Sequence, residues 1–286
     1  MPQPKAKIGV IGGSGLYDIE GMTAIKEVDI TTPFGKPSDT IITGKLGGVG
    51  IAFLPRHGKG HRILPAEVPS RANIYALKSL GVERIIAVCS AGSFKKEIEP
   101  GHLLIPDQLI DRTRSRPSTF FGEGIVAHVP FADPFCLELS EVLYDSATAV
   151  GATVHPKGTF VVMEGPAFST RAESRLYRSW GADLIGMTAL PEAKLAREAE
   201  ICYAIIGCVT DYDSWWQPGK PITVDVILDT MHRNVDTAKN IIKLAVSRIA
   251  EKRNCPCPTA LETAIVTAGD LIPKAQKEKL SLLIGK

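Results

Sequence analysis

The chain has 286 residues, of which 44% are apolar and 22% are charged. This balance is typical of a folded globular protein and excludes the low hydrophobicity and high charge of a disordered one. The formal net charge is +2, so composition gives no argument for nucleic acid or a membrane surface as a partner, and a small ligand fits better. Because we find neither a signal-peptide core nor an apolar run long enough to span a membrane, we expect a cytoplasmic location.

Strands and helices alternate along the predicted chain. A first strand is expected over 7–12, and a strand pair over 39–43 and 49–54. Helices are then predicted over 65–80, 135–150, 170–180, 191–200 and 223–252, and strands over 84–88, 159–163, 183–186 and 201–210. This alternation predicts the α/β class: a three-layer sandwich in which a mixed, mostly parallel central sheet has helices on both faces.

One domain is expected over 1–253, because a chain of this size is close to the upper limit for a single core. A C-terminal tail over 254–286 follows, where the composition shifts to Pro and Cys and then to Lys. Its charged segment 274–279 is either a short helix or partly disordered.

The six cysteines fall into two groups. Four lie in apolar segments, where buried and inert thiols are the usual outcome: Cys89, Cys136, Cys202 and Cys208. Cys255 and Cys257 flank Pro256 and have no Cys or His partner at zinc-ligand spacing, so no metal site is predicted. They either close a disulfide or remain free thiols.

Three loops at predicted strand ends have the composition of an anion site. The turn 12–15 (GGSG) offers backbone N–H groups, although a plain tight turn is the alternative. Arg56 and His57 follow the strand 49–54; a guanidinium binds phosphate through two hydrogen bonds, and the neighbouring imidazole can add a donor. The alternative is that they cap a surface turn. The third loop, 89–93 (CSAGS), has small residues that allow amides and hydroxyls to line a cleft.

Two glycine-loop families do not fit the turn 12–15. A dinucleotide fingerprint would need a third glycine where Tyr17 and Asp18 stand, and a Walker loop would need a following Gly-Lys-Ser/Thr.

Three further segments have side chains that suit a nucleoside. Phe168, in the segment 163–173, either stacks on a purine or packs in the core. Met187 and Thr188 end the strand 183–186. Asp211 and Asp213 end the most apolar strand, where burial raises a carboxyl pKa and lets the acid protonate a leaving group. Metal ligation and a solvated acidic turn are the alternatives.

Taken in order, the motifs resemble the trimeric purine nucleoside phosphorylase superfamily, and within it the methylthioadenosine phosphorylases. The motifs are GGSGLYD, TPFGKPSD, FLPRHG, ADPFC, EGPAFSTRAES, GMTALPEAKLA, ICYA and VTDYD, and they span residues 7–250. The resemblance implies phosphorolysis of S-methyl-5'-thioadenosine to adenine and S-methyl-5-thioribose 1-phosphate. Inorganic phosphate would be the co-substrate, with no metal and no other cofactor.

The resemblance also implies a role for each site residue. Phosphate would be held by Ser14, Arg56, His57, Ser90 and Thr188, with the backbone around Cys89 helping. Met187 would lie along the ribose and Phe168 against the base. Asp211 would be the catalytic hydrogen-bond or proton donor to purine N7, and Asp213 would accept from the 6-amino group. Val224 and Ile227 would form an apolar pocket for the methylthio group.

His128 resembles a residue that the family lends across a subunit interface, which implies a homo-oligomer, either a trimer or a dimer of trimers. Relatives that process 6-oxopurines carry Asn where Asp211 stands and Glu where Ser169 stands, so adenine is the expected base. Many relatives have Thr in place of Cys89. The CxC pair at 255–257 resembles thermophilic archaeal members, which implies a hyperthermophilic source.

Two rival functions remain at this stage. One is a nicotinamide-dependent oxidoreductase built on the strand and glycine turn at 7–15. The other is a purine-binding or sensing protein on the same scaffold, which would bind ligand without phosphate-dependent turnover.

Overall fold

The computed structural model describes residues 5–13, 16, 19–216 and 224–285, without the side chains of 224–229, 231 and 232. In these ranges the strands are β1 (Ile8–Gly12), β2 (Met22–Val28), β3 (Ile41–Leu46), β4 (Val49–Pro55), β5 (Arg84–Ser93), β6 (Leu103–Leu104), β7 (Gln108–Arg112), β8 (Val154–His155), β9 (Thr159–Met163), β10 (Leu184–Gly186) and β11 (Cys202–Tyr212). They form one sheet in the order β2-β3-β4-β1-β5-β10-β9-β7, with β11 paired to β5 and β6, and β8 paired to β6.

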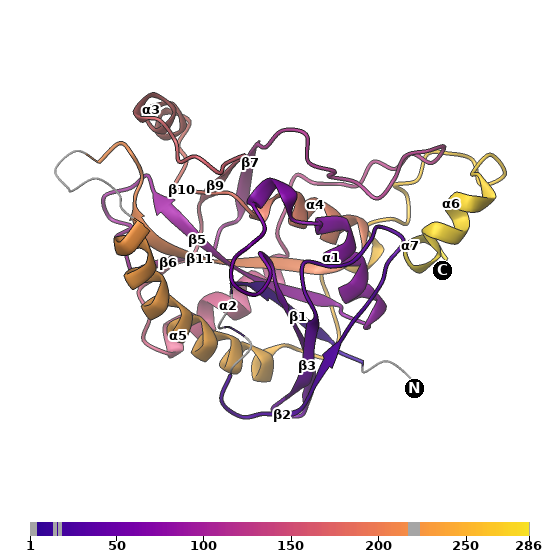
Figure 1. Cartoon of the computed structure of the whole chain (residues 1–286), viewed down its shortest axis with the longest axis horizontal. Helices are drawn as coiled ribbons and strands as arrows, with labels where there is room; N and C mark the ends of the chain where they lie inside the picture. Colours follow the sequence, from indigo (N-terminus) through magenta and orange to yellow (C-terminus); the bar gives the residue numbers. More distant parts are fainter. Residues whose placement is uncertain (1–4, 14–15, 17–18, 217–223, 286) are drawn as a thin grey trace.

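Helices cover both faces of this sheet, as predicted (Figure 1). They are α1 (Ser70–Ser79), α2 (Leu137–Ala149), α3 (Arg171–Ser179), α4 (Ala189–Glu198), α5 (Val224–Arg248), α6 (Lys274–Lys279) and α7 (Ser281–Ile284), with short 3-10 turns at Pro65–Glu67 and Cys257–Thr259. The apolar sides of α2 and α5 pack into one core cluster, and those of α1 and α4 into another. Among the described residues, no helix is long and apolar enough to cross a lipid bilayer.

Four neighbouring strands bring the candidate loops to one edge of the sheet. β4, β1, β5 and β11 lie side by side and run parallel. Ligands bind outside the carboxyl ends of such strands, because the loops that leave them gather there. The loops after β1, β4 and β11 and the last residues of β5 therefore share this edge, and β10 joins them by running antiparallel to the end of β5.

The strands that the sequence did not predict are either exposed or very short. β2 is almost entirely exposed, β7 is half-exposed, and β6 and β8 have two residues each. β5 is longer than the predicted 84–88, because the small residues up to Ser93 continue to pair with β11 and β10. The long strand matters because its last residues carry the site.

Residues beyond 253 pack against the domain and do not project from it. Leu261, Ala264, Leu280 and Leu283 are buried in the cluster that also holds α1 and α4. The charged segment 274–279 is a helix, α6, at the right of Figure 1. The tail also pairs with the loop before α2, where the amide of His128 donates to Ala264 O at 2.8 Å.

Cys255 and Cys257 are free thiols with cysteine neighbours in space, although no partner stands at zinc-ligand spacing in the sequence. The sulfurs of Cys136, at the start of α2, and of Cys202, the first residue of β11, lie beside both. Sequence spacing could not show this, because the three segments meet only in the folded chain.

We expect Leu280→Ala to lower the free energy of unfolding by about 2–5 kcal/mol, as for other buried Leu to Ala changes. Leu280 is completely buried, whereas Leu282 is 37% exposed and serves as the control. Leu282→Ala should cost less than about 1 kcal/mol. Urea denaturation of both variants checks this, and equal effects would show that the tail does not stabilise the core.

Candidate active site

The end of β5 is open on one face. Ser90 is exposed, although its neighbours Cys89 and Ala91 are only 2% and 3% exposed. Because strand side chains alternate between the two faces, Ser90 and the half-buried Gly92 share the open face. The contacts made along β5 from Val88 to Gly92 define the candidate site.

Arg56, the first residue after β4, is 2% exposed and does not cap a surface turn. Its Nε donates to Glu192 Oε1 at 2.5 Å and its Nη2 to Glu192 Oε2 at 3.1 Å. Nη1 donates to the carbonyl of Val88 at 2.9 Å. Tyr203 OH also donates to Glu192 Oε2, at 3.0 Å. The pair therefore connects β4, β5, α4 and β11.

Arg56 therefore makes its bidentate hydrogen bonds to a carboxylate of the protein itself, that of Glu192. Although burial alone would lower the pKa of Arg56, the Glu192 carboxylate raises it, so the guanidinium stays charged. The guanidinium also donates from Nη2 to the carbonyl of Ile11 at 3.5 Å and hydrogen-bonds the Cys89 side chain. The sequence prediction named Arg56 but missed Glu192.

His57 is a neutral acceptor in this structure. Its Nδ1 lies 2.8 Å from the carbonyl of Ile63, and a carbonyl only accepts, so Nδ1 carries the hydrogen. Burial and the Arg56 charge lower the pKa of His57 to about 4. At neutral pH its Nε2 is therefore unprotonated. The sequence prediction treated this imidazole as a donor.

Thr188 lies against the next residue of β5. Its Oγ1 donates to the Cys89 sulfur at 3.6 Å, and as the N-cap of α4 it makes no side-chain capping bond. Ser90 is the next exposed hydroxyl on β5. Ser14, predicted for the same anion site, lies outside the described residues.

Met187 follows β10 and packs closely on Gly165. Gly165 has φ of +67°, and a Cβ built on it would lie 2.5 Å from Met187 Sδ, so a side chain there would displace Met187. Arg116 holds both loops: it donates to the carbonyls of Met187 at 2.6 Å and Glu164 at 2.5 Å, and pairs with the Glu164 carboxylate at 3.1 Å. Sequence reasoning missed Arg116, which lies in a loop without a recognisable motif.

Asp211 is brought to the open face by an irregularity in β11. The pairing with β5 shifts between Val209 and Asp211, so that Thr210 is an extra residue, a β-bulge that redirects the following side chains. Thr210 Oγ1 donates to Asp211 Oδ1 at 2.6 Å. A Cβ built on Gly92 would lie 3.2 Å from Asp211 Oδ2 and 3.4 Å from Asp213 Cβ, so both acids lie over this glycine.

Asp213 is buried and Asp211 is partly buried, which argues against a solvated acidic turn. Burial raises the pKa of Asp211 to about 6, with a smaller contribution from Asp213. Burial also raises the pKa of Asp213. Asp213 Oδ1 accepts from Ser169 at 2.7 Å, whereas Oδ2 is buried and has no hydrogen-bond partner among the described residues. A proton donor and an unsatisfied acceptor therefore lie side by side.

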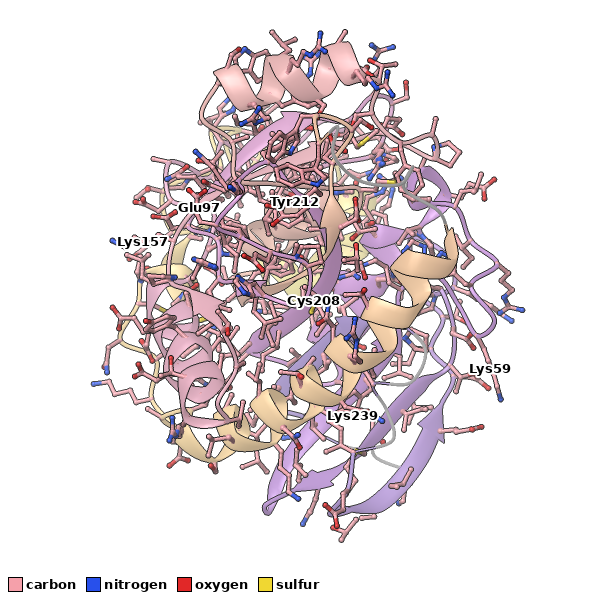
Figure 2. The ribbon with its side chains drawn as sticks, turned by 90° about the vertical axis from the view of Figure 1, so that its left-hand side faces the viewer. Lys59, Glu97, Lys157, Cys208, Tyr212 and Lys239 are labelled. Carbon is pink, nitrogen blue, oxygen red and sulfur yellow. The ribbon has the colours of Figure 1, made fainter. Side chains whose placement is uncertain are left out.

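Phe168 is 55% exposed and is not part of the core. Its loop is attached to the acidic turn by two contacts, Ser169 Oγ to Asp213 and Ser214 Oγ to the carbonyl of Ser169 at 2.8 Å. The exposed ring therefore borders the acidic turn. Figure 2 shows Tyr212 close to the end of β11 and Cys208 deeper in the same strand.

Three predicted residues are not brought into this site by any described contact. Val224 and Ile227 lie in the first turns of α5, and their side chains are outside the described part. His128 is exposed, and its backbone pairs with the C-terminal tail. A cavity of about 600 Å³ lies elsewhere, between α5 and the β3–β4 turn, where Lys243 and Gly47 line it.

Comparison with known proteins gives consistent matches over the whole chain. The family model described as "Phosphorylase superfamily" matches residues 7–247. The S-methyl-5'-thioadenosine phosphorylase of Geobacter sulfurreducens is 58% identical over 97% of this chain and 98% of that protein. The protein of the same name from Koribacter versatilis is 54% identical over 99% and 97%.

Solved structures agree with these matches. A methylthioadenosine phosphorylase sourced from an antarctic soil metagenomic library has a TM-score of 0.95 and 47% identity, covering 99% of this chain and all (100%) of that one. A methylthioadenosine phosphorylase from Schistosoma mansoni, in complex with tubercidin, has a TM-score of 0.81 and 38% identity over 90% and 96%.

We expect Glu192→Gln to lower the free energy of unfolding by about 3–5 kcal/mol, because it leaves the buried Arg56 charge without its counterion. Lys194→Ala is the control, since it breaks a pair with Asp111 whose side chains are 33% and 34% exposed. That change should cost about 1 kcal/mol or less. Denaturant titration compares the two, and a Glu192→Gln effect no larger than the control would contradict the importance given to the buried pair.

Proposed function

The chain belongs to the phosphorylase superfamily, and on that basis we propose that it cleaves S-methyl-5'-thioadenosine with inorganic phosphate. The products are adenine and S-methyl-5-thioribose 1-phosphate. The relatives that share 54–58% identity over nearly the full chain carry the name of this activity. The enzyme is therefore a pentosyltransferase of the purine nucleoside phosphorylase type.

The order of contacts along β5 is the observation that supports this function best. Arg56 contacts Val88, Thr188 contacts Cys89, and the two acids lie over Gly92. From Val88 to Gly92 the strand advances by about 13 Å, at roughly 3.3 Å per residue. The groups proposed to bind phosphate thus contact the start of this stretch, and the acids proposed to bind the base contact its end. This is the order of phosphate, sugar and purine in the reacting complex.

The reaction needs positioning and charge stabilisation from the protein, without a covalent intermediate. The bond between N9 and C1' breaks as a phosphate oxygen bonds to C1' from the opposite face. Protonated Asp211 donates its proton to N7 of the leaving adenine, and solvent later restores it. Preorganised donors of this kind are typically worth roughly 3–4 kcal/mol in the transition state. No metal or organic cofactor takes part in this scheme.

At the phosphate end, the site combines several hydrogen-bond donors with one acceptor. This set matches monohydrogen phosphate, which has acceptor oxygens and one P–OH donor. We assign the Arg56 guanidinium and the hydroxyls of Ser14, Ser90 and Thr188 as donors to phosphate oxygens. His57 Nε2 would instead accept from the P–OH group, because its Nδ1 already donates to Ile63. Holding the nucleophile in line in this way accounts for a large part of the rate of such displacements.

At the base end, the buried groups match adenine. The 6-amino group supplies the donor that Asp213 Oδ2 lacks. A 6-oxopurine would instead present a carbonyl oxygen to this acceptor and leave both unsatisfied, which costs binding free energy. The exposed ring of Phe168 provides a stacking surface for the base.

The remaining parts of the site are assigned by resemblance. Val224 and Ile227 would surround the methylthio group. His128 would complete the site of a neighbouring copy in a trimer or dimer of trimers, which agrees with its exposed position away from its own site. A cytoplasmic location suits this small-molecule salvage reaction.

The decisive experiment measures adenine release from S-methyl-5'-thioadenosine with and without inorganic phosphate. We expect turnover only with phosphate, and none when sulfate replaces it, because sulfate has no P–OH group for His57. Equal release without phosphate would make the chain a hydrolase. Ligand binding without any turnover would favour the purine-binding alternative.

Asp211→Asn should change both the pH profile and the base preference. In the native chain the protonated acid is lost as pH rises through about 6, so kcat/KM should fall about tenfold per pH unit above that value. An asparagine amide does not titrate, so the variant should have a lower rate without this decline. It should also shift preference from adenine toward hypoxanthine nucleosides.

Steady-state rates at saturating phosphate across pH 5 to 9 test this, with the exposed Asp145→Asn as control. A variant that keeps the native pH decline and the native base preference would remove Asp211 from the chemical step.

A further inference from the structure

Four cysteines from three separate segments form one cluster on the side of the sheet covered by α2 and α5. Their sulfur atoms all lie within 4.8 Å of one another. The members of this four-cysteine cluster are Cys136, Cys202, Cys255 and Cys257. All of them are free thiols, and Cys255 alone is more than slightly exposed. The reaction proposed above uses none of them.

The arrangement of the sulfurs is that of a tetrahedral metal site. In a zinc tetrathiolate with Zn–S bonds of 2.3 Å, the sulfurs are about 3.8 Å apart, and all six distances are equal. Four sulfurs within 4.8 Å of one another are therefore close to this geometry, and the Cys202–Cys255 distance of 3.3 Å lies slightly below it. Two disulfides would need only two close pairs, each about 2.05 Å apart, and not a mutual set of four.

Contacts that do not involve sulfur hold the tail in place beside the core. The Arg253 guanidinium donates to the carbonyl of Glu200 at 2.8 Å. The amide of Asn254 donates to the Glu138 carboxylate at 2.9 Å, and the amide of Leu261 to the Glu200 carboxylate at 3.2 Å. Surrounding hydrogen bonds of this kind orient the ligands of metal sites. The backbone that carries Cys255 and Cys257 is thus positioned before any metal binds.

One end of a helix also favours negative charge at this cluster. Cys136 is the N-cap residue of α2, a 13-residue helix whose N-terminal end favours negative charge. A divalent cation is the partner that would stabilise all four sulfurs as thiolates.

We propose that the four-cysteine cluster binds one Zn²⁺ ion as a structural tetrathiolate site. Four Zn–S bonds form as four S–H protons are released to solvent, with no oxidation or reduction. The ion would fasten the C-terminal tail to the starts of α2 and β11. Because no ligand position remains open, the site stabilises the fold and takes no part in catalysis.

The test uses the full chain produced in zinc-supplemented medium and purified without chelator. Elemental analysis should give about one zinc per chain. Cys136→Ala and Cys257→Ala should lose the metal, whereas Cys208→Ala, which alters a buried thiol of β11 outside the cluster (Figure 2), should keep it. A zinc content that is the same in all three variants would overturn the proposal.

A second measurement covers variants that fail to fold. The native chain, stripped of metal under reductant, should take up one Co²⁺ and develop the intense absorption of tetrahedral cobalt thiolate. Mass spectrometry after alkylation in denaturant, without reductant, should find all six thiols modified. A native chain that fails to bind Co²⁺ would refute the site. So would a mass that shows four of the thiols joined in two disulfides on isolation.

Discussion

The buried ion pair between Arg56 and Glu192 is the contact on which the anion end of the site depends. It brings the end of β4 against the carbonyl of Val88 in β5, and through Glu192 and Tyr203 it also involves α4 and β11. An unpaired guanidinium could not remain at 2% exposure without a large free-energy cost. The pairing also explains why the Arg56 guanidinium is buried against Glu192 and is not exposed as a fork for an anion.

The same strand orders the rest of the site. Successive residues of β5 contact Arg56, then Thr188, then the two acids, while Arg116 fixes the loops that carry Glu164 and Met187. The side chains come from several elements, but each is positioned against one strand, β5, which pairs with β1, β10 and β11. Such placement on regular structure gives the geometric precision that an in-line displacement needs.

Much of this could be predicted from local patterns. Apolar runs identified most strands, and the rule that parallel strands end at one edge placed Arg56, Thr188 and Asp211 together. Glu192 and Arg116 were missed, because their partners are 136 and 47 or more residues away and no spacing signals them. The exposed β2 and the four-cysteine cluster were missed for the same physical reason. Both are defined by contacts between distant segments, and neither has a periodic sequence pattern that would reveal it.

The extra residue at Thr210 makes the acidic turn sensitive to added chain length. Strand side chains alternate with a period of two, so inserting one further residue before Asp211 would move it out of register with Gly92 and turn both Asp211 and Asp213 to the opposite face of the sheet. Removing Thr210 itself would leave Asp211 opposite Gly92, because Thr210 is the residue without a partner, but the hydroxyl that donates to Asp211 would be lost. Insertions in this part of β11 should therefore be tolerated far less in evolution than insertions in the surface loops.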